Sequence, residues 1–255
     1  MELIFIGTGS AIESLNRFHS SFLIQSKNYN LLIDAGDGVS KALLKQEVNY
    51  CSIDGIIFTH FHPDHFSGLG GLIVQMEFLQ REKPLQIFTH QELIPFVTDY
   101  LHLSYLFEQK ISYKIEFVGF EHEKEFDVCD KIKVKSKCNT HIDAYKIYDE
   151  ENKNYFSSSG FLFNLKDKKL FYTGDVGCKD DLLLFTEEKI DYMITEITHI
   201  STEDITETAK KLHPSKLYLT HISDDDLQKI ETIISKTSLQ NILTIKAVDG
   251  LKFNL

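Results

Sequence analysis

Residues 59–65 read Thr-His-Phe-His-Pro-Asp-His. This stretch places three imidazoles and one carboxylate, from His60, His62, Asp64 and His65, within six positions. Imidazole nitrogen and carboxylate oxygen are the ligands that zinc binds where thiolates are absent. Burying such groups without partners would cost roughly 2–7 kcal/mol each, so they need a metal, water or one another. The stretch predicts a metal site, with a polar loop of incidental histidines as the alternative.

Three further candidate ligands follow runs that resemble strands, as His60 does. Asp175 and His221 come directly after apolar runs, and His141 follows a run in which apolar and polar residues alternate. Side chains at strand ends can converge at one edge of a sheet. Five histidines and two aspartates exceed one tetrahedral zinc and favour two metal ions that share a carboxylate. Taken singly, His141 and His221 would be ordinary core or surface histidines, and Asp175 a turn residue.

Composition narrows the class of protein. The chain has 255 residues, 42% hydrophobic and 25% charged, which fits one α/β domain over residues 1–255, or two small ones. The formal net charge of −11 disfavours long nucleic acids as substrates, although not small nucleotides. The four cysteines lack a Cys-x-x-Cys pair, as in a reducing cytosol. Without a secretory signal or an apolar run of about 20 residues, a cytoplasmic protein that does not contact membranes is expected.

Strand and helix patterns alternate in both halves of the chain. Apolar runs predict strands at residues 3–6, 21–26, 30–34, 55–59, 85–89, 131–137, 161–165, 169–173, 192–195, 216–220, 244–248 and 251–254. Helical spacing predicts helices at residues 39–47, 65–81, 92–103, 205–212 and 224–236. Turn residues predict hairpins that join 21–26 to 30–34, 161–165 to 169–173, and 244–248 to 251–254. The mixture indicates two sheets packed together with helices outside.

Lysines alternate with other residues in the predicted strand 131–137. They are Lys131, Lys133, Lys135 and Lys137. Such lysines often protect an edge strand from pairing with neighbouring molecules, and we expect that role here. The alternative is a stripe that attracts substrate phosphate.

The order of the candidate ligands resembles the metallo-β-lactamase superfamily over the whole chain. That resemblance implies a four-layer αββα sandwich of the α/β class and a dinuclear centre, with Zn²⁺ expected and Mn²⁺ as the alternative. It further implies one ion on His60, His62 and His141, a second on Asp64, His65 and His221, and Asp175 bridging them. Some true β-lactamases carry a cysteine at the Asp175 position, and its absence here argues against antibiotic hydrolysis.

Other segments resemble the ribonuclease Z and phosphodiesterase branch of that superfamily. These are Phe5-Ile6-Gly7-Thr8-Gly9-Ser10 at the start and Thr220-His221-Ile222-Ser223 near the end. His199 precedes His221 at the place where ribonuclease Z carries a catalytic histidine, and Glu196 matches the glutamate that pairs with it. The alternative for this pair is a surface glutamate and histidine near the start of a helix.

The chain departs from ribonuclease Z between His141 and Asp175. Ribonuclease Z usually inserts a long Gly/Pro-rich arm there that grips tRNA, whereas this chain has a short loop at 148–154 with three carboxylates and one lysine. We therefore expect a phosphodiesterase that hydrolyses small phosphodiesters, above all cyclic nucleotides. In that reaction Asp64 would accept a proton from water, and His199, oriented by Glu196, would donate one.

Three alternatives remain open at this level. The first is ribonuclease Z activity, with a dimer partner supplying the grip on RNA. The second is a thioester or lactone hydrolase of the same fold. The third is a metal-bound protein that sequesters a nucleotide without hydrolysing it. The resemblance also implies a homodimer.

Overall fold

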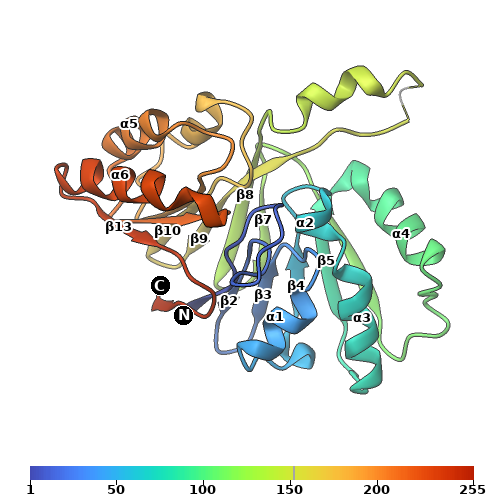
Figure 1. Ribbon diagram of the computed structural model, residues 1–255. Coiled ribbons are helices and arrows are strands. Elements are labelled where there is room, and N and C mark those ends of the chain that lie inside the picture. The colour runs from blue at the N-terminus through green and yellow to red at the C-terminus, as the bar shows by residue number, and fades with distance from the viewer. Residues whose placement is uncertain (152) are drawn as a thin grey trace. The chain divides into compact units, whose positions relative to one another are not determined.

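The computed structural model describes residues 1–151 and 153–255 (Figure 1), so Asn152, in the predicted acidic loop, lies outside the described residues. The chain divides into two compact units. The first comprises Met1–Glu121 and Val248–Leu255, and the second comprises His122–Ala247. The assignment of residues 1–255 to a single domain stays a prediction.

The first unit contains a seven-stranded mixed sheet with strand order β14-β1-β2-β3-β4-β5-β6. Its strands are β1 (Glu2–Gly7), β2 (Ser21–Gln25), β3 (Asn30–Ile33), β4 (Gly55–Ile57), β5 (Leu85–His90), β6 (Ile115–Phe120) and β14 (Lys252–Asn254). Its α-helices are α1 (Val39–Lys45), α2 (Pro63–Phe66), α3 (Leu69–Phe78) and α4 (Ile94–Leu103). The run from β3 to β6 is parallel, and β2 and β3 form the predicted antiparallel hairpin.

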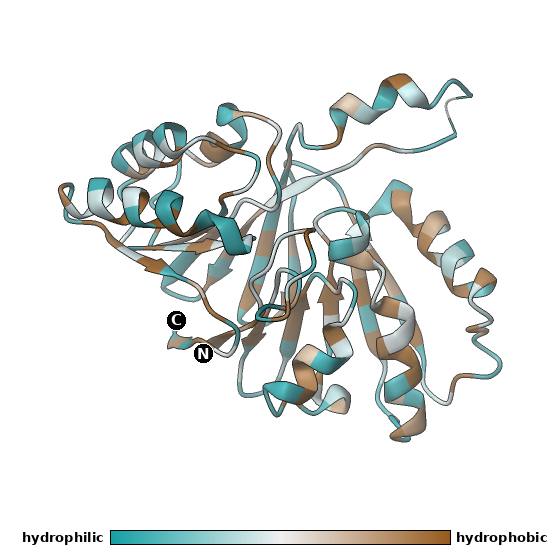
Figure 2. Ribbon diagram, in the orientation of Figure 1, coloured by the Kyte–Doolittle hydropathy of each residue, from teal (hydrophilic) through white to brown (hydrophobic). Residues whose placement is uncertain are grey.

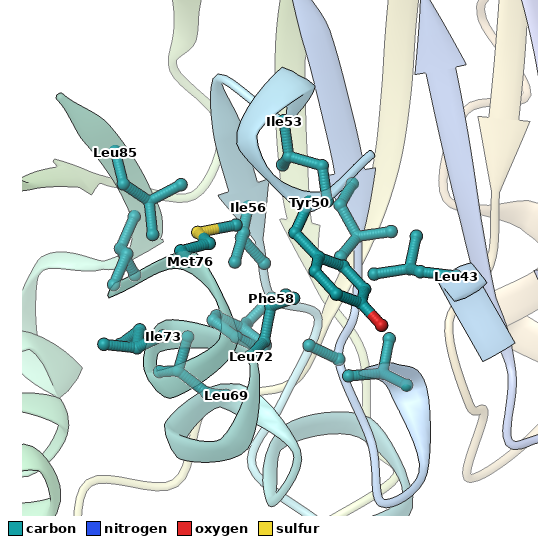
Figure 3. Packing of buried hydrophobic residues seen from close by; sticks show 14 of the residues in the cluster. Leu43, Tyr50, Ile53, Ile56, Phe58, Leu69, Leu72, Ile73, Met76 and Leu85 are labelled. Atoms are coloured by element: carbon teal, nitrogen blue, oxygen red, sulfur yellow. The ribbon is translucent and has the colours of Figure 1, made fainter. Parts of the chain in front are cut away.

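Helix α3 anchors the core of this unit (Figure 3). Leu69, Leu72, Ile73 and Met76 follow the i, i+3, i+4, i+7 spacing of one helical face, and all four are fully buried. They belong to the same cluster as Phe58, which directly follows β4. Burying each such side chain contributes about 1.5–3 kcal/mol. This packing holds in place the chain that continues into the histidine-rich stretch.

The single helix predicted over 65–81 is wrong, because the chain forms α2 and α3 with a break at Gly68. The Gly68 N–H donates a hydrogen bond to Ala35 O at 2.9 Å. A Cβ on Gly68 would lie 2.1 Å from Gly36 O, so only glycine allows this close approach. The break ties the short helix that carries His65 to the loop after β3.

The second unit contains another seven-stranded mixed sheet, with order β13-β12-β11-β10-β9-β8-β7. Its strands are β7 (Glu125–Cys129), β8 (Ile132–Cys138), β9 (Ser159–Leu165), β10 (Lys168–Tyr172), β11 (Tyr192–Glu196), β12 (Lys216–Thr220) and β13 (Leu243–Lys246). The α-helices α5 (Thr202–Leu212) and α6 (Leu227–Ser238) pack on its core. In Figure 2 both helices contain many hydrophilic residues, as amphipathic helices that cover a sheet do.

The lysine-bearing strand is not an edge strand, so that prediction is wrong. β8 lies between β7 and β9, and β7 forms the edge. The lysines instead reach carboxylates: Lys133 Nζ lies 3.2 Å from Asp127 Oδ1, and Lys137 Nζ lies 2.6 Å from Glu187 Oε1. Ion pairs at the protein surface are screened by solvent and contribute little to stability.

The hairpin predicted to join 244–248 to 251–254 is also wrong. β13 pairs with β12 in the second sheet, whereas β14 pairs with β1 in the first. The turn residue Asp249 makes long-range bonds, because its carboxylate accepts from Thr8 Oγ1 at 2.7 Å and from Phe18 N at 2.9 Å. These bonds hold the C-terminal segment against the start of the chain.

Two mixed sheets with flanking helices confirm the predicted α/β class. Cys51, Cys129, Cys138 and Cys178 are free thiols. Across residues 1–151 and 153–255, no helix has the length and apolar character needed to cross a membrane.

Candidate metal centre

The first unit gathers the imidazoles of the histidine-rich stretch. β4 delivers His60, and α2 carries Asp64 and His65 in its single turn. The ring of His60 lies 4.6 Å from that of His62 and 4.3 Å from that of His65, centre to centre. His65 Nε2 lies 3.4 Å from Asp64 Oδ2. Since His60 and His65 are almost fully buried, this is not a solvated polar loop.

Asp34 orients this group, although the sequence analysis did not single it out. It follows β3, the parallel neighbour of β4, and is fully buried. Its carboxylate accepts hydrogen bonds from Thr59 N at 2.8 Å, Thr59 Oγ1 at 2.9 Å and His65 Nδ1 at 2.9 Å. Burial raises the pKa of the Asp34 carboxyl, and the neighbouring His65 and Thr59 oppose that rise. The strand-end rule that selected His60 also applies to Asp34.

These bonds determine which nitrogen each histidine offers. His65 donates its Nδ1 proton to Asp34. Thr59 Oγ1 gives its single proton to Asp34, so at 3.0 Å from His60 Nδ1 it accepts the proton of that ring. Both rings therefore present Nε2 lone pairs. A histidine whose other nitrogen donates to a carboxylate or hydroxyl is the usual arrangement of a metal ligand.

In the second unit, histidines gather around Asp175. Asp175 follows β10 and His221 follows β12, so parallel strands bring them to the same sheet edge. Measured to Asp175 Oδ2, the distance is 3.3 Å from His221 Nε2, 3.7 Å from His141 Nε2 and 3.8 Å from His199 Nδ1. Asp175 and His221 are almost fully buried, whereas the His199 side chain is 36% exposed.

Glu196 binds His199, as the sequence predicts. Glu196 ends β11 and is 1% exposed. Its Oε1 accepts from His199 Nδ1 at 3.0 Å, and its Oε2 accepts from the His199 backbone N–H at 2.9 Å. Ser201 caps α5, as the alternative interpretation expected, yet the buried Glu196 is not a surface residue. Because His199 Nδ1 is held by Glu196, this ring is not available as a ligand through that atom.

Thr198 orients His221, and the sequence analysis missed it. Its Oγ1 donates to His221 O at 2.6 Å and lies 3.1 Å from His221 Nδ1. A hydroxyl has one proton, so Nδ1 of His221 carries the proton of this second bond, which leaves Nε2 facing Asp175. His221 also has φ +55°, a left-handed conformation that side chains other than glycine rarely adopt. The backbone is thus constrained at a candidate ligand.

The donor set of each unit fits a divalent metal. Atoms bound at about 2.0–2.2 Å to a tetrahedral zinc lie about 3.4 Å from one another. The distance from His221 to Asp175 and the distance from His65 to Asp64 are close to that value, and the distance from His141 to Asp175 is slightly longer. Nitrogen and oxygen donors without thiolate suit zinc and several neighbouring metals.

Comparison with known proteins gives a consistent family assignment. The family model described as anti-Pycsar protein Apyc1 matches residues 1–243. Ribonuclease Z of Thermoplasma acidophilum is 24% identical, covering 88% of this chain and 86% of that protein. The metallo-β-lactamase fold protein YhfI from Bacillus subtilis superposes with a TM-score of 0.77 at 18% identity, covering 99% of this chain and 98% of that one. Human tRNase Z, short form, has a TM-score of 0.72 at 22% identity, covering 100% and 99%.

The solved structures confirm the metallo-β-lactamase fold. The ribonuclease Z relatives confirm the resemblance to that branch and a metal-dependent hydrolase. The structures are too distant in sequence to carry more than the fold. The family model, in contrast, spans nearly the whole chain. The chain belongs to the family of the anti-Pycsar protein Apyc1.

Proposed function

We propose that this protein is a dinuclear metal-dependent phosphodiesterase whose substrates are small phosphodiesters, above all cyclic nucleotides. The observation that carries the proposal is the buried Glu196 bound to the accessible His199, whose Nδ1 lies 3.8 Å from Asp175. A proton donor beside a metal ligand suits cleavage of a bond with a poor leaving group. The relatives named ribonuclease Z support phosphodiester chemistry.

We propose two divalent ions, Zn²⁺ with Mn²⁺ as the alternative. The assignment to individual ions rests on donor chemistry and on the family resemblance. One ion would be held by His60, His62 and His141. The other would be held by Asp64, His65 and His221, and Asp175 would be shared. When bound, such ions polarise phosphoryl oxygens and lower the pKa of a water molecule toward ~7.

The residues of the chain then move two protons. Asp64 accepts a proton from the attacking water. Protonated His199 donates its Nε2 proton to the leaving oxygen as the phosphorus–oxygen bond breaks. Glu196 holds the Nδ1 proton and stabilises the charged ring, so both N–H groups of the imidazolium are oriented. For a cyclic mononucleotide, both products are parts of one molecule, a nucleoside monophosphate.

Charge supports a small substrate over RNA. The protein carries a formal net charge of −11, and the predicted acidic loop lies where ribonuclease Z inserts its RNA-binding arm. Repulsion grows with the number of phosphates, so a substrate with one phosphodiester is penalised least. Similarity to ribonuclease Z over 88% of the chain favours tRNA 3′ processing as the second candidate, and thioester or lactone hydrolysis is the third.

The test is turnover by metal-reconstituted protein of a panel of cyclic mono- and dinucleotides, a precursor tRNA with a 3′ trailer, and a lactone and a thioester. We expect hydrolysis of at least one cyclic nucleotide and little tRNA cleavage. Trailer removal with no cyclic nucleotide hydrolysis would replace the proposal by ribonuclease Z activity. Tight nucleotide binding without product over hours would indicate sequestration.

We further propose that the protein is a homodimer in the cytoplasm. Analytical ultracentrifugation would test the oligomeric state, and cell fractionation would test the location.

A further inference from the structure

We propose that Asp181 is a positioning residue that holds His141 and Asp175 at the spacing needed to bind metal. The inference rests on the proposed role of these two residues as ligands. Asp181 lies in the 3-10 helix η4 (Lys179–Leu183) and is 3% exposed.

The Asp181 carboxylate joins the two loops that carry the ligands. In the loop of His141, the donors are Thr140 Oγ1, at 2.8 Å from the carboxylate, and Thr140 N, at 3.1 Å. From the loop of Asp175, it accepts Gly177 N at 2.8 Å and Cys178 N at 3.2 Å. Thr140 directly precedes His141, and Gly177 is two residues after Asp175. One buried group thus fixes the backbone beside both ligands.

Two other contacts show that the loops are tightly joined. A Cβ on Gly177 would lie 2.6 Å from Thr140 O, so the backbones touch where the carboxylate binds them. Asn139 adds a second link, since its Nδ2 donates to Asp175 O at 2.8 Å and its Oδ1 accepts from His141 N at 3.2 Å. We infer that these two connections, through Asp181 and through Asn139, keep His141 Nε2 at 3.7 Å from Asp175 Oδ2.

All four of these bonds end on Oδ2 of Asp181, and Oδ1 also accepts from Thr140 N at 3.1 Å. A buried charge is costly unless hydrogen bonds compensate it, and here four donors converge on it. In Asp181→Asn the side chain loses its charge. With the amide oxygen at the Oδ2 position, the NH₂ group takes the Oδ1 position and faces the N–H of Thr140. The bonds that join the two loops are then weaker, although the shape of the side chain is nearly unchanged.

The test compares Asp181→Asn with the control Asp191→Asn by metal analysis after dialysis and by chelator competition. The Asp191 carboxylate also joins two elements, because it accepts from Lys169 N at 3.0 Å and from Lys168 Nζ at 2.8 Å. Asp191 precedes the start of β11, whereas Asp175 and His221 follow the ends of the parallel strands β10 and β12, so Asp191 lies at the opposite edge of the sheet. We expect Asp181→Asn to weaken binding of at least one ion about 10- to 100-fold, as loss of groups that orient ligands does. We expect Asp191→Asn to keep wild-type metal affinity.

Thr140→Val and Thr140→Ser provide a gentler pair if Asp181→Asn does not fold. The valine variant removes the 2.8 Å bond and should weaken metal binding, whereas serine should restore it. Wild-type metal affinity in Asp181→Asn, or in Thr140→Val where the first variant is unfolded, would overturn the inference. Because the readout is metal affinity, it is independent of the substrate: failure to hydrolyse cyclic nucleotides would defeat the proposed function alone.

Discussion

Glu196→Gln should prevent His199 from acting as a proton donor while leaving the fold and the candidate metal ligands in place. Two backbone donors, Thr198 N at 2.5 Å and His199 N at 2.9 Å, point at Oε2 of Glu196. The glutamine must therefore keep its oxygen at that position. Its NH₂ then occupies the Oε1 position, where it faces His199 Nδ1 and Val176 N.

This arrangement opposes the catalytic form of the ring. An amide NH₂ group cannot accept a hydrogen bond, so His199 Nδ1 must become the acceptor, and the imidazolium with two N–H groups is disfavoured. Loss of a general acid lowers the rate about 10²- to 10⁴-fold, and a wrong histidine tautomer in serine proteases costs about 10⁴-fold. The Val176 N–H, 3.3 Å from Oε1, loses its acceptor, which lowers the free energy of unfolding by about 1–3 kcal/mol.

The assay is steady-state hydrolysis of bis-p-nitrophenyl phosphate and of a cyclic nucleotide by Glu196→Gln, His199→Ala and the double variant. The activated p-nitrophenolate needs little protonation, so its hydrolysis should fall less than that of the nucleotide. If both residues act as one unit, the double variant should be no slower than His199→Ala alone. Nitrogen NMR of labelled His199 reports the tautomer directly.

Two results would refute this reasoning. The first is a Glu196→Gln enzyme within threefold of wild type on the nucleotide while His199→Ala loses at least a hundredfold. The second is an unchanged Nδ1–H signal in the glutamine variant. Either would show that Glu196 does not control the proton on His199.

Three other predictions concern the metal ligands and the core. Asp64→Ala should abolish turnover with unchanged circular dichroism, and retention of most activity would contradict the proton-accepting role. Leu72→Ala, at a fully buried position, should lower the free energy of unfolding in urea by about 2–5 kcal/mol without changing metal content. Removing metal with a chelator should abolish hydrolysis and lower the melting temperature, and both should recover when Zn²⁺ or Mn²⁺ is added. A melting temperature indifferent to metal would argue against binding by the folded protein.

The features predictable from the sequence were those that depend on near neighbours. Apolar runs predicted the strands that deliver His60 and His221, because a strand buried on both faces leaves a continuous apolar signal. The pairing of Glu196 with His199 was likewise expected, and the two residues lie close along the chain. Where three-residue spacing suffices to bring two groups together, local pattern is informative.

Long-range contacts account for two of the errors. The break at Gly68 depends on the approach of Gly36, which lies 32 residues earlier. The false hairpin at 249–250 looked like a standard turn, but Asp249 is held by Thr8, at the other end of the chain. The third error is local: β8 lies inside its sheet because β7 pairs with it, and the polar–apolar alternation of β7 was not used to predict a strand.

Two of the groups that orient the candidate ligands were hidden for the same reason. Thr198 and Asp181 are ordinary polar residues in sequence, and their importance comes from what they touch, whereas Asp34 ends a predicted strand and could have been selected by that position. Asp34 reaches His65, which lies 31 residues away, and Asp181 reaches Thr140, which lies 41 residues away. A metal ligand can be recognised in the sequence by its residue type and spacing, whereas the residue that sets the tautomer of that ligand can be any acceptor at hydrogen-bonding distance.

The ligands themselves do not choose the substrate, since one fold supports many chemistries around the same donors. Substrate specificity must come from groups that contact the leaving oxygen and from the electrostatic field of the protein, through which the substrate approaches. His199, 36% exposed and held by a buried carboxylate, can protonate a poor leaving group such as a ribose oxygen. A lactone or thioester has less need of that proton, because its leaving group departs from a carbonyl that the metal already activates. An acidic protein surface penalises RNA at every phosphate, but a cyclic nucleotide only once. The acid–base pair thus argues against a lactone or thioester and the net charge argues against RNA, and the substrate class left by both arguments is a small phosphodiester.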